Sequence, residues 1–268
     1  MLSRTRGAAA ALLLTIAAPA ALAAQGSERA FSFNERVPSG EWVRVKNVNG
    51  EIRVTASSSD RVEIVATKHW RRGDPKDVRI ESRKTGNGGI LVCAFWTENA
   101  TCSETGYNSH NDDRDRNRNR NNDVAVDFEV RVPRGVKVGM SSVNGQVSVE
   151  GATDEVVAST VNGGVNATSS GGPVMGNTVN GSVHARMGKL TGDDDLEFSS
   201  VNGTVVAEFG TDIDANIELS TVNGRFQTDW PVTITGRVDP RHLRATLGKG
   251  GRRIRLSTVN GNVELRKM

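Results

Sequence analysis

The chain has 268 residues, with 34 Lys and Arg against 31 Asp and Glu, so its formal net charge is only +3. So small a charge excludes the strongly basic surface of a nucleic-acid-binding protein, and we expect no nucleic-acid partner. The length allows one or two domains with a sizeable core, which excludes a disulfide-dependent miniprotein. Only 4% of the residues are aromatic and 29 are glycine, which indicates small side chains buried in repeated layers.

The first 23 residues have the parts of a secretory signal peptide. Arg4 and Arg6 precede an apolar run over residues 8–18, and residues 21–23 (Ala-Leu-Ala) supply the small side chains that signal peptidase needs. The apolar run is too short for a good membrane anchor. We therefore predict a signal peptide over residues 1–23 and a mature protein that is periplasmic or secreted and associated with the cell envelope.

Residues 27–132 are predicted to form an irregular amino-terminal β region, which contains the only two cysteines, Cys93 and Cys102. An exported protein meets an oxidising compartment, and eight intervening residues can close a short loop. Because no histidine cluster or CxxC pair surrounds the two cysteines, a structural disulfide is favoured over a metal site or a catalytic thiol. Reduction should loosen this loop and leave the rest of the fold intact.

A polar segment over residues 103–123 is predicted to be a mobile loop, because residues 108–123 contain no apolar side chain. A calcium-loop interpretation that begins at Asp113 fails, since Arg118 stands where glycine is needed and Val124 where glutamate is needed. The loop could instead contact an anionic ligand, although nearby aspartates nearly cancel its positive charge. The possible ligand contacts are Arg114, Arg116, Arg118 and Arg120.

The tripeptide Val-Asn-Gly occurs seven times and dominates the sequence. From Asn144 onward the asparagines are 18, 18, 22, 21 and 37 residues apart, and 37 is close to two units with one degenerate copy. The 95 residues between Asn49 and Asn144 correspond to about five diverged units. The predicted repeat turns are Asn49-Gly50, Asn144-Gly145, Asn162-Gly163, Asn180-Gly181, Asn202-Gly203, Asn223-Gly224 and Asn260-Gly261.

Apolar and polar residues alternate on both sides of each tripeptide. Counted from the valine, positions −5, −3, +4 and +6 are mainly apolar, and position −1 is Ser, Thr or Asn. Such alternation on both sides of a turn predicts strand–turn–strand units, and no helical periodicity follows the signal peptide. The sequence thus predicts an all-β protein whose repeats are regular over residues 133–268.

Two architectures fit this pattern. Asn-Gly is a favourable two-residue hairpin turn, so the units could be stacked β-hairpins, which would leave the valine of every copy on the wet face. In a β-solenoid with coils of 18–22 residues, the chain bends at the repeat, the valine turns inward, and like residues stack, so that the asparagine amides can bond to one another. Because a solvent-exposed face would not require the same valine in every copy, we favour the solenoid.

The chain resembles the bacterial "putative adhesin" family of exported β-strand-repeat proteins. The resemblance rests on residues 41–54 (Glu-Trp-Val-Arg-Val-Lys-Asn-Val-Asn-Gly-Glu-Ile-Arg-Val), on residues 127–133 (Asp-Phe-Glu-Val-Arg-Val-Pro) and on the Ser/Thr-Val-Asn-Gly units up to residue 261. It covers most of the mature chain and implies a right-handed parallel β-helix-like fold and a cell-envelope location. It implies no known catalytic residues, and the polar insert near residues 103–123 departs from the family.

We therefore predict a non-enzymatic envelope protein, an adhesin or surface-interaction protein, that contacts an envelope polymer, a membrane surface or a protein as a monomer. No cofactor or metal is predicted, because the four histidines are far apart and no phosphate-binding or dinucleotide motif is present. Two alternatives stay open. One is a β-helix enzyme that acts on polysaccharide, although positions +3 and +5 show no cluster of carboxylates. The other is an envelope-stress sensor that binds an anionic ligand through loop 103–123.

Overall fold

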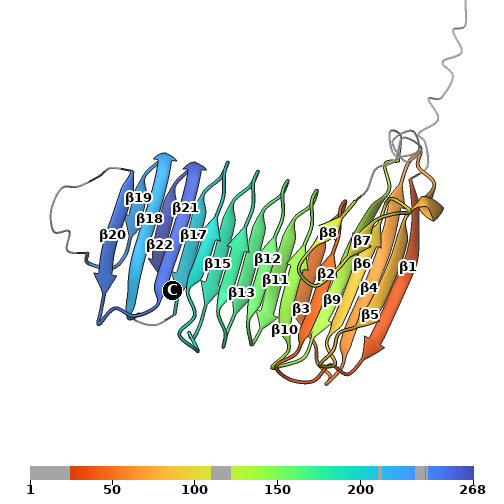
Figure 1. Cartoon of the computed structure of the whole chain (residues 1–268), viewed down its shortest axis with the longest axis horizontal. Coiled ribbons are helices and arrows are strands. Elements are labelled where there is room, and N and C mark those ends of the chain that lie inside the picture. Colours follow the sequence, from red (N-terminus) through yellow and green to blue (C-terminus); the bar gives the residue numbers. More distant parts are fainter. Residues whose placement is uncertain (1–24, 110–121, 211–212, 233–238, 240) are drawn as a thin grey trace, which may run out of the picture.

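The protein consists of two large β-sheets whose strands lie side by side along the long axis of the molecule (Figure 1). A computed structural model describes residues 25–109, 122–210, 213–232, 239 and 241–268. The predicted signal peptide and the four arginines of loop 103–123 lie outside the described residues. Over the described ranges, the only helical segment is the single turn η1 (Pro75–Asp77), so the all-β prediction is confirmed and no helix could cross a membrane.

Each large sheet has ten strands. The first has the order β1 (Gly26–Glu35), β4 (Val62–Trp70), β9 (Ala125–Val132), β3 (Ile52–Ala56), β11 (Val147–Ala152), β13 (Val165–Ser169), β15 (Val183–Met187), β17 (Val205–Phe209), β22 (Val263–Lys267) and β19 (Phe226–Thr228). The second has the order β20 (His242–Leu247), β18 (Ala215–Asn223), β21 (Arg253–Asn260), β16 (Leu196–Ser199), β14 (Val174–Asn177), β12 (Val156–Ser159), β10 (Lys137–Ser141), β2 (Trp42–Lys46), β6 (Ile90–Phe95) and β5 (Arg79–Lys84). A small separate hairpin joins β7 (Thr101–Cys102) to β8 (Tyr107–Asn108).

The two strands of one repeat belong to different sheets. The turn at Asn144 leads from β10 in the second sheet to β11 in the first, so the interpretation as stacked hairpins is wrong. Equivalent strands of successive repeats pair in parallel instead, with Val138 beside Val156 and Val147 beside Val165. The sheets are mixed because antiparallel strands close their ends, at β1, β4 and β5 on one side and at β20 on the other.

The core lies between the two sheets and is built from the alternating apolar positions. At −5, −3, +4 and +6 nearly every side chain of the stacked repeats is buried, as at Val156, Ala158, Val165 and Ala167. Removing these aliphatic groups from water is the main favourable contribution to folding. Because equivalent residues are in register, positions −5 and +4 place branched aliphatic side chains over one another along most of the stack, whereas at position −3 the large Phe198 lies beside Gly176.

The chain doubles back at both ends of the stack. For that reason two predictions are wrong: five diverged units between the first two asparagines of the repeat, and a degenerate copy between the last two. Asn49 forms a bridge directly to Asn144, so no coils lie between them, and β4, β5, β6 and β9 lie beyond β2 and β3 instead. At the other end, Asn260 lies between Asn202 and Asn223. The 37-residue spacing therefore contains β19 and the antiparallel β20, and not a degenerate coil.

Candidate functional site

The seven repeat turns form one straight corner of the stack, where the residue at −1 and the glycine have structural roles. In the six turns from Asn144 onward, the −1 hydroxyl is buried and donates a hydrogen bond to the glycine carbonyl of the adjacent repeat, as from Thr160 Oγ1 to the Gly145 oxygen at 2.8 Å; in the first turn Asn47 donates from Nδ2 to the Val126 carbonyl instead. A Cβ atom at Gly203 would fall on the carbonyl oxygen of Gly181. The close approach of neighbouring backbones thus requires glycine at this position.

The asparagines of the corner form a continuous amide ladder. Asn162 Nδ2 donates to Asn144 Oδ1 at 2.8 Å, and Asn180, Asn202, Asn260 and Asn223 continue the ladder in that order with the same distance. At the amino-terminal end, Asn49 Nδ2 donates to the Val124 carbonyl instead, at 2.9 Å. Each inner asparagine therefore donates one amide bond and accepts another, which fixes the register of the repeats.

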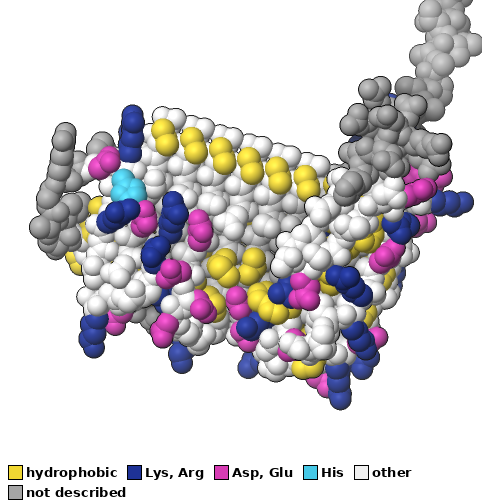
Figure 2. Space-filling view, in the orientation of Figure 1, with side chains coloured by type: hydrophobic (Ala, Val, Ile, Leu, Met, Phe, Trp, Pro, Cys, Tyr) yellow, Lys and Arg dark blue, Asp and Glu magenta, His cyan; other side chains and the backbone are white. Residues whose placement is uncertain are grey.

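The valine of the repeat points into solvent, and the prediction that it turns inward is wrong. The alternation continues through the valine and changes phase at Asn-Gly, so the residue at −1 is the last one that faces the core before the bend. We call the exposed row the valine ridge, and Figure 2 shows it as a line of hydrophobic side chains along one edge. In stacking order, with their exposed fractions, its members are Val143 (36%), Val161 (38%), Val179 (38%), Val201 (39%), Val259 (40%) and Val222 (50%).

A groove of about 400 Å³ lies on the outer face of the second sheet, beside the β7–β8 hairpin. The disulfide between Cys93 and Cys102, which is present as predicted, ties this hairpin to the outer face of β6. There Leu91, Cys93 and Phe95 form a second small hydrophobic cluster with Tyr107. We call this the hairpin groove, and its lining residues are Trp42, Arg44, Lys46, Glu104, Thr105, Gly139, Met140, Ser141, Val157 and Ser159.

Two cations of β2 face the hairpin groove. Arg44 donates from Nη1 to Glu104 Oε2 at 2.9 Å, and its guanidinium lies 4.2 Å from the centre of the Trp42 ring. Lys46 has no ion-pair or hydrogen-bond partner among the described residues. Burial, and then the charge of Arg44, lower the pKa of Lys46 below its usual value. The groove therefore holds one ammonium group without a counter-charge.

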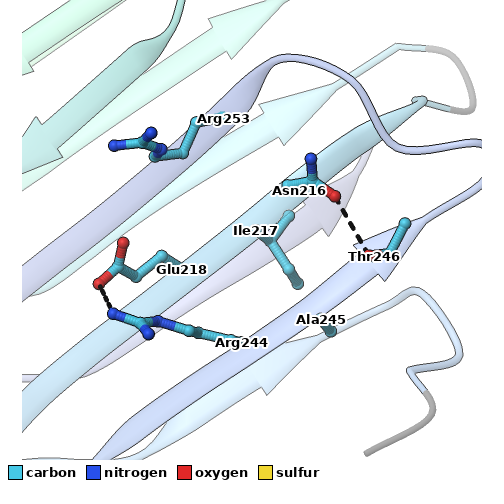
Figure 3. A pocket seen from close by; sticks show the side chains of 7 residues that line it. All are labelled: Asn216, Ile217, Glu218, Arg244, Ala245, Thr246 and Arg253. Carbon is cyan, nitrogen blue, oxygen red and sulfur yellow. Dashed lines mark hydrogen bonds and ion pairs between the residues drawn. The ribbon is translucent and has the colours of Figure 1, made fainter.

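A second groove, of about 540 Å³, lies near the opposite end of the second sheet, between β18, β20 and β21 (Figure 3). Glu218 accepts from Arg244 Nη2 at 3.3 Å, and His242 Nε2 lies 3.3 Å from the same oxygen. Burial alone would raise the pKa of Glu218, but the hydrogen bond and charge of Arg244, with Arg255 and His242, outweigh it and lower the pKa. The groove is lined by Asn216, Ile217, Glu218, Arg244, Ala245, Thr246 and Arg253.

This second groove is poorly suited to acid–base chemistry. A general acid for glycoside cleavage needs a carboxyl group whose pKa is raised, whereas Glu218 is held in its charged form. Nor do the described residues contain a group of three or more His, Cys, Asp or Glu side chains that could hold a metal ion. In this groove Glu218 therefore forms an ion pair with Arg244 instead.

Sequence reasoning found the corner and the disulfide but missed the valine ridge and the hairpin groove. The predicted ligand contacts of loop 103–123 lie outside the described residues. A signal for Lys46 was present, because all other repeats carry Ser or Asn at the same position relative to the valine.

No family profile and no curated protein matches the chain. Among solved structures, it is similar to a putative cell adhesion protein from Clostridium sporogenes ATCC 15579, with 9% identity and a TM-score of 0.45 over 90% of this chain and 100% of that one. It is also similar to a putative adhesin from Bacteroides fragilis NCTC 9343, with 10% identity and a TM-score of 0.35 over 89% of this chain and 96% of that one. At these scores neither likeness bears on function.

Proposed function

We propose that this chain is a non-enzymatic, exported cell-envelope protein, folded as a right-handed parallel β-solenoid, and that the valine ridge is its contact surface. The observation that carries the proposal is the exposure of the same apolar side chain at one position of successive repeats. The hydroxyl at −1, the asparagine and the glycine each have a role inside the stack, but nothing inside the stack requires the outward side chain to be apolar.

The geometry of the ridge favours an extended partner. Neighbouring strands are about 4.8 Å apart, so six stacked valines span about 24 Å. The ridge lies between the asparagine ladder and a row of outward Ser and Asn side chains, which gives an apolar line with polar groups on both sides. Such a surface suits an envelope polymer, a membrane surface or an extended protein segment.

The predicted signal peptide and the disulfide support export. A disulfide between Cys93 and Cys102 persists in an oxidising compartment and is rare in the cytosol. The groove at β18, β20 and β21 is lined by one carboxylate, Glu218, whereas glycoside cleavage uses a pair, which favours a binding protein over a polysaccharide-cleaving enzyme.

The test replaces four ridge valines by threonine, which keeps the shape and the strand preference of the side chain and removes a methyl group from the apolar row. The variant carries Val143→Thr, Val161→Thr, Val179→Thr and Val201→Thr. Binding of the purified protein to isolated cell-envelope material and to a glycan array would be compared with wild type. We expect the threonine variant to keep its melting temperature and lose binding.

A matched control carries isoleucine at the same four positions, which keeps the ridge apolar, and should bind as wild type. If the threonine variant binds as tightly as wild type, the ridge is not the contact surface.

The second candidate is a sensor that binds an anionic ligand through loop 103–123. What favours it is Lys46, which has no counter-charge among the described residues and lies beside the β7–β8 hairpin, whose turn and second strand form the first part of that predicted loop. Deleting residues 110–121 should abolish anion binding if the arginines of the loop are the ligand contacts, and should leave it unchanged if the hairpin groove alone is responsible.

A further inference from the structure

We propose that the hairpin groove is a binding site for a carboxylate-bearing saccharide, with its carboxylate at Lys46 and its hydroxyl groups at Ser141 and Ser159. The site lies on the outer face of β2, β10 and β12, and no ridge valine lines it, although Ser141 and Ser159 stand two residues before the ridge valines of their repeats. It therefore goes beyond the proposed function and does not depend on the ridge.

Lys46 is the exception in a row of small polar side chains. The equivalent outward position of every other repeat carries a hydroxyl or an amide, and these residues are neighbours along the second sheet. In order along the sheet from Lys46 they are Ser141, Ser159, Asn177, Ser199, Ser257 and Ser220. The stack thus folds with a small polar group here, so the long cation at Lys46 has no structural counterpart in the other repeats.

The charge balance of the groove indicates a single negative charge on the ligand. Arg44 is already satisfied by the Glu104 carboxylate, with 20% of the Arg44 side chain and 44% of the Glu104 side chain exposed. Lys46 remains without a partner among the described residues, which leaves one net positive charge. A carboxylate matches that charge, whereas a phosphate monoester would bring a second negative charge beside Glu104.

The floor of the groove suits a sugar ring. Gly139, Ser141, Val157 and Ser159 are half-buried and short, so the floor is shallow and flat. In the part of the chain that the structure describes, the hydroxyls of Ser141 and Ser159 make no side-chain hydrogen bond, which leaves both as donors and acceptors for a ligand. The volume of about 400 Å³ is within the usual range of small-molecule sites.

These features favour a saccharide over a membrane surface. Membrane attraction uses clusters of about four to eight basic residues on a convex or flat surface. The hairpin groove is concave and has one unpaired cation between the β7–β8 hairpin and the floor. Glu104, at the turn of the hairpin, would also repel an anionic bilayer.

The test is calorimetric titration of the oxidised, mature protein with galacturonate trimers and with hyaluronan tetrasaccharides. Maltotriose serves as the neutral control, and inorganic phosphate and phosphatidylglycerol vesicles serve as the other anions. We expect one of the two acidic oligosaccharides to bind, with affinity about tenfold weaker in Lys46→Ser, because an ion pair at a half-buried site is lost. Lys46→Arg should keep binding, and Lys189→Ser, at an exposed lysine outside the groove, should bind as wild type.

Lys46→Ser places the residue of the other repeats at this position, so the variant should fold, which a thermal melt would check. The proposal is overturned if neither acidic oligosaccharide binds at about 5 mM, if maltotriose binds as tightly, or if Lys46→Ser has no effect. Binding of phosphate or of the vesicles in place of the oligosaccharides also overturns it. A variant with Val201→Thr and Val259→Thr, at ridge positions of repeats that do not line the groove, should still bind the oligosaccharide, so the failure of one proposal is distinguishable from the failure of the other.

Discussion

The side-chain amide of Asn162 donates a 2.8 Å hydrogen bond to the amide oxygen of Asn144, 18 residues earlier in the chain. The same contact links the six repeats from Asn144 onward in their stacking order, so an inner asparagine donates on one side and accepts on the other. An ionised Asp could only accept, and the short Ser hydroxyl could not reach its equivalent across the strand spacing of about 4.8 Å, whereas the longer amide donates from its nitrogen and accepts at its oxygen.

Replacing an inner member of the ladder should cost stability. Asn180→Ala removes the bonds to Asn162 and to Asn202, and leaves one donor and one acceptor to water at an exposed site. We expect the free energy of unfolding to fall by about 1 kcal/mol, measured by chemical denaturation. Asn166→Ala, on the outer face of β13, removes an asparagine outside the ladder and should be near neutral; equal losses in the two variants would contradict a role for the ladder.

Replacement by alanine should affect stability differently at a glycine of the Val-Asn-Gly tripeptide and at a glycine that directly follows one. At Gly203 the new Cβ would meet the Gly181 carbonyl, so Gly203→Ala should destabilise by about 3 kcal/mol through forced backbone movement. At Gly164 the nearest atom is 3.5 Å away, an ordinary contact. Gly164→Ala should therefore be neutral or stabilising by up to about 1 kcal/mol, and similar losses at both positions would show that backbone approach is not the constraint.

The disulfide should protect the hairpin and the groove beside it. In a variant with Cys93→Ala and Cys102→Ala, the unfolded state gains the entropy of a short loop, which corresponds to at most about 3 kcal/mol. Because the hairpin packs on the outer face of β6 and contacts Arg44 of β2, outside the core between the sheets, hydrogen exchange should accelerate at Thr101–Asn108 and stay slow in β10 to β17. Uniform acceleration would instead mean that the disulfide supports the whole stack. Saccharide binding at Lys46 should also weaken, because the β7–β8 hairpin lines one side of the hairpin groove.

Asp123 should make stability depend on pH in the acid range. Its Oδ1 accepts backbone N–H groups of Gly73 (2.9 Å), Arg72 (3.1 Å) and Arg71 (3.2 Å), and these bonds lower the pKa of its carboxyl. A carboxyl whose pKa is lower in the folded state contributes stability above the unfolded-state pKa of about 3.9, and the contribution is lost as the pH falls through the folded-state pKa.

Unfolding of wild type and Asp123→Asn would be compared at neutral pH and below the unfolded-state value. The destabilisation by Asp123→Asn should be present at neutral pH and shrink in acid, whereas Asp193→Asn, at an exposed turn, should show no such change. A difference independent of pH would show that the charge of Asp123 is not involved.

The local pattern of the repeats predicted which residues face the core, because period-two alternation is a property of single strands. It also predicted the amide ladder, since stacking of equal units places equal residues together. It could not predict that Asn260 lies between Asn202 and Asn223, because pairing order depends on contacts between distant segments. The valine was misplaced because its identity in every copy was attributed to burial, and the phase change occurs at the following asparagine and glycine.

The insertion of β21 and β22 between earlier strands has a consequence for assembly. The chain leaves β16 and β17, forms β18 and β19, and only then supplies the two strands that separate these pairs. A nascent chain emerging from its amino terminus cannot complete this end in the order of synthesis, because β18 has no neighbour of its final sheet except β20 until the last segment arrives. Both sheets at this end of the molecule therefore depend on residues 253–267, and neither β18 nor β19 can reach its final parallel neighbour before that segment has been synthesised.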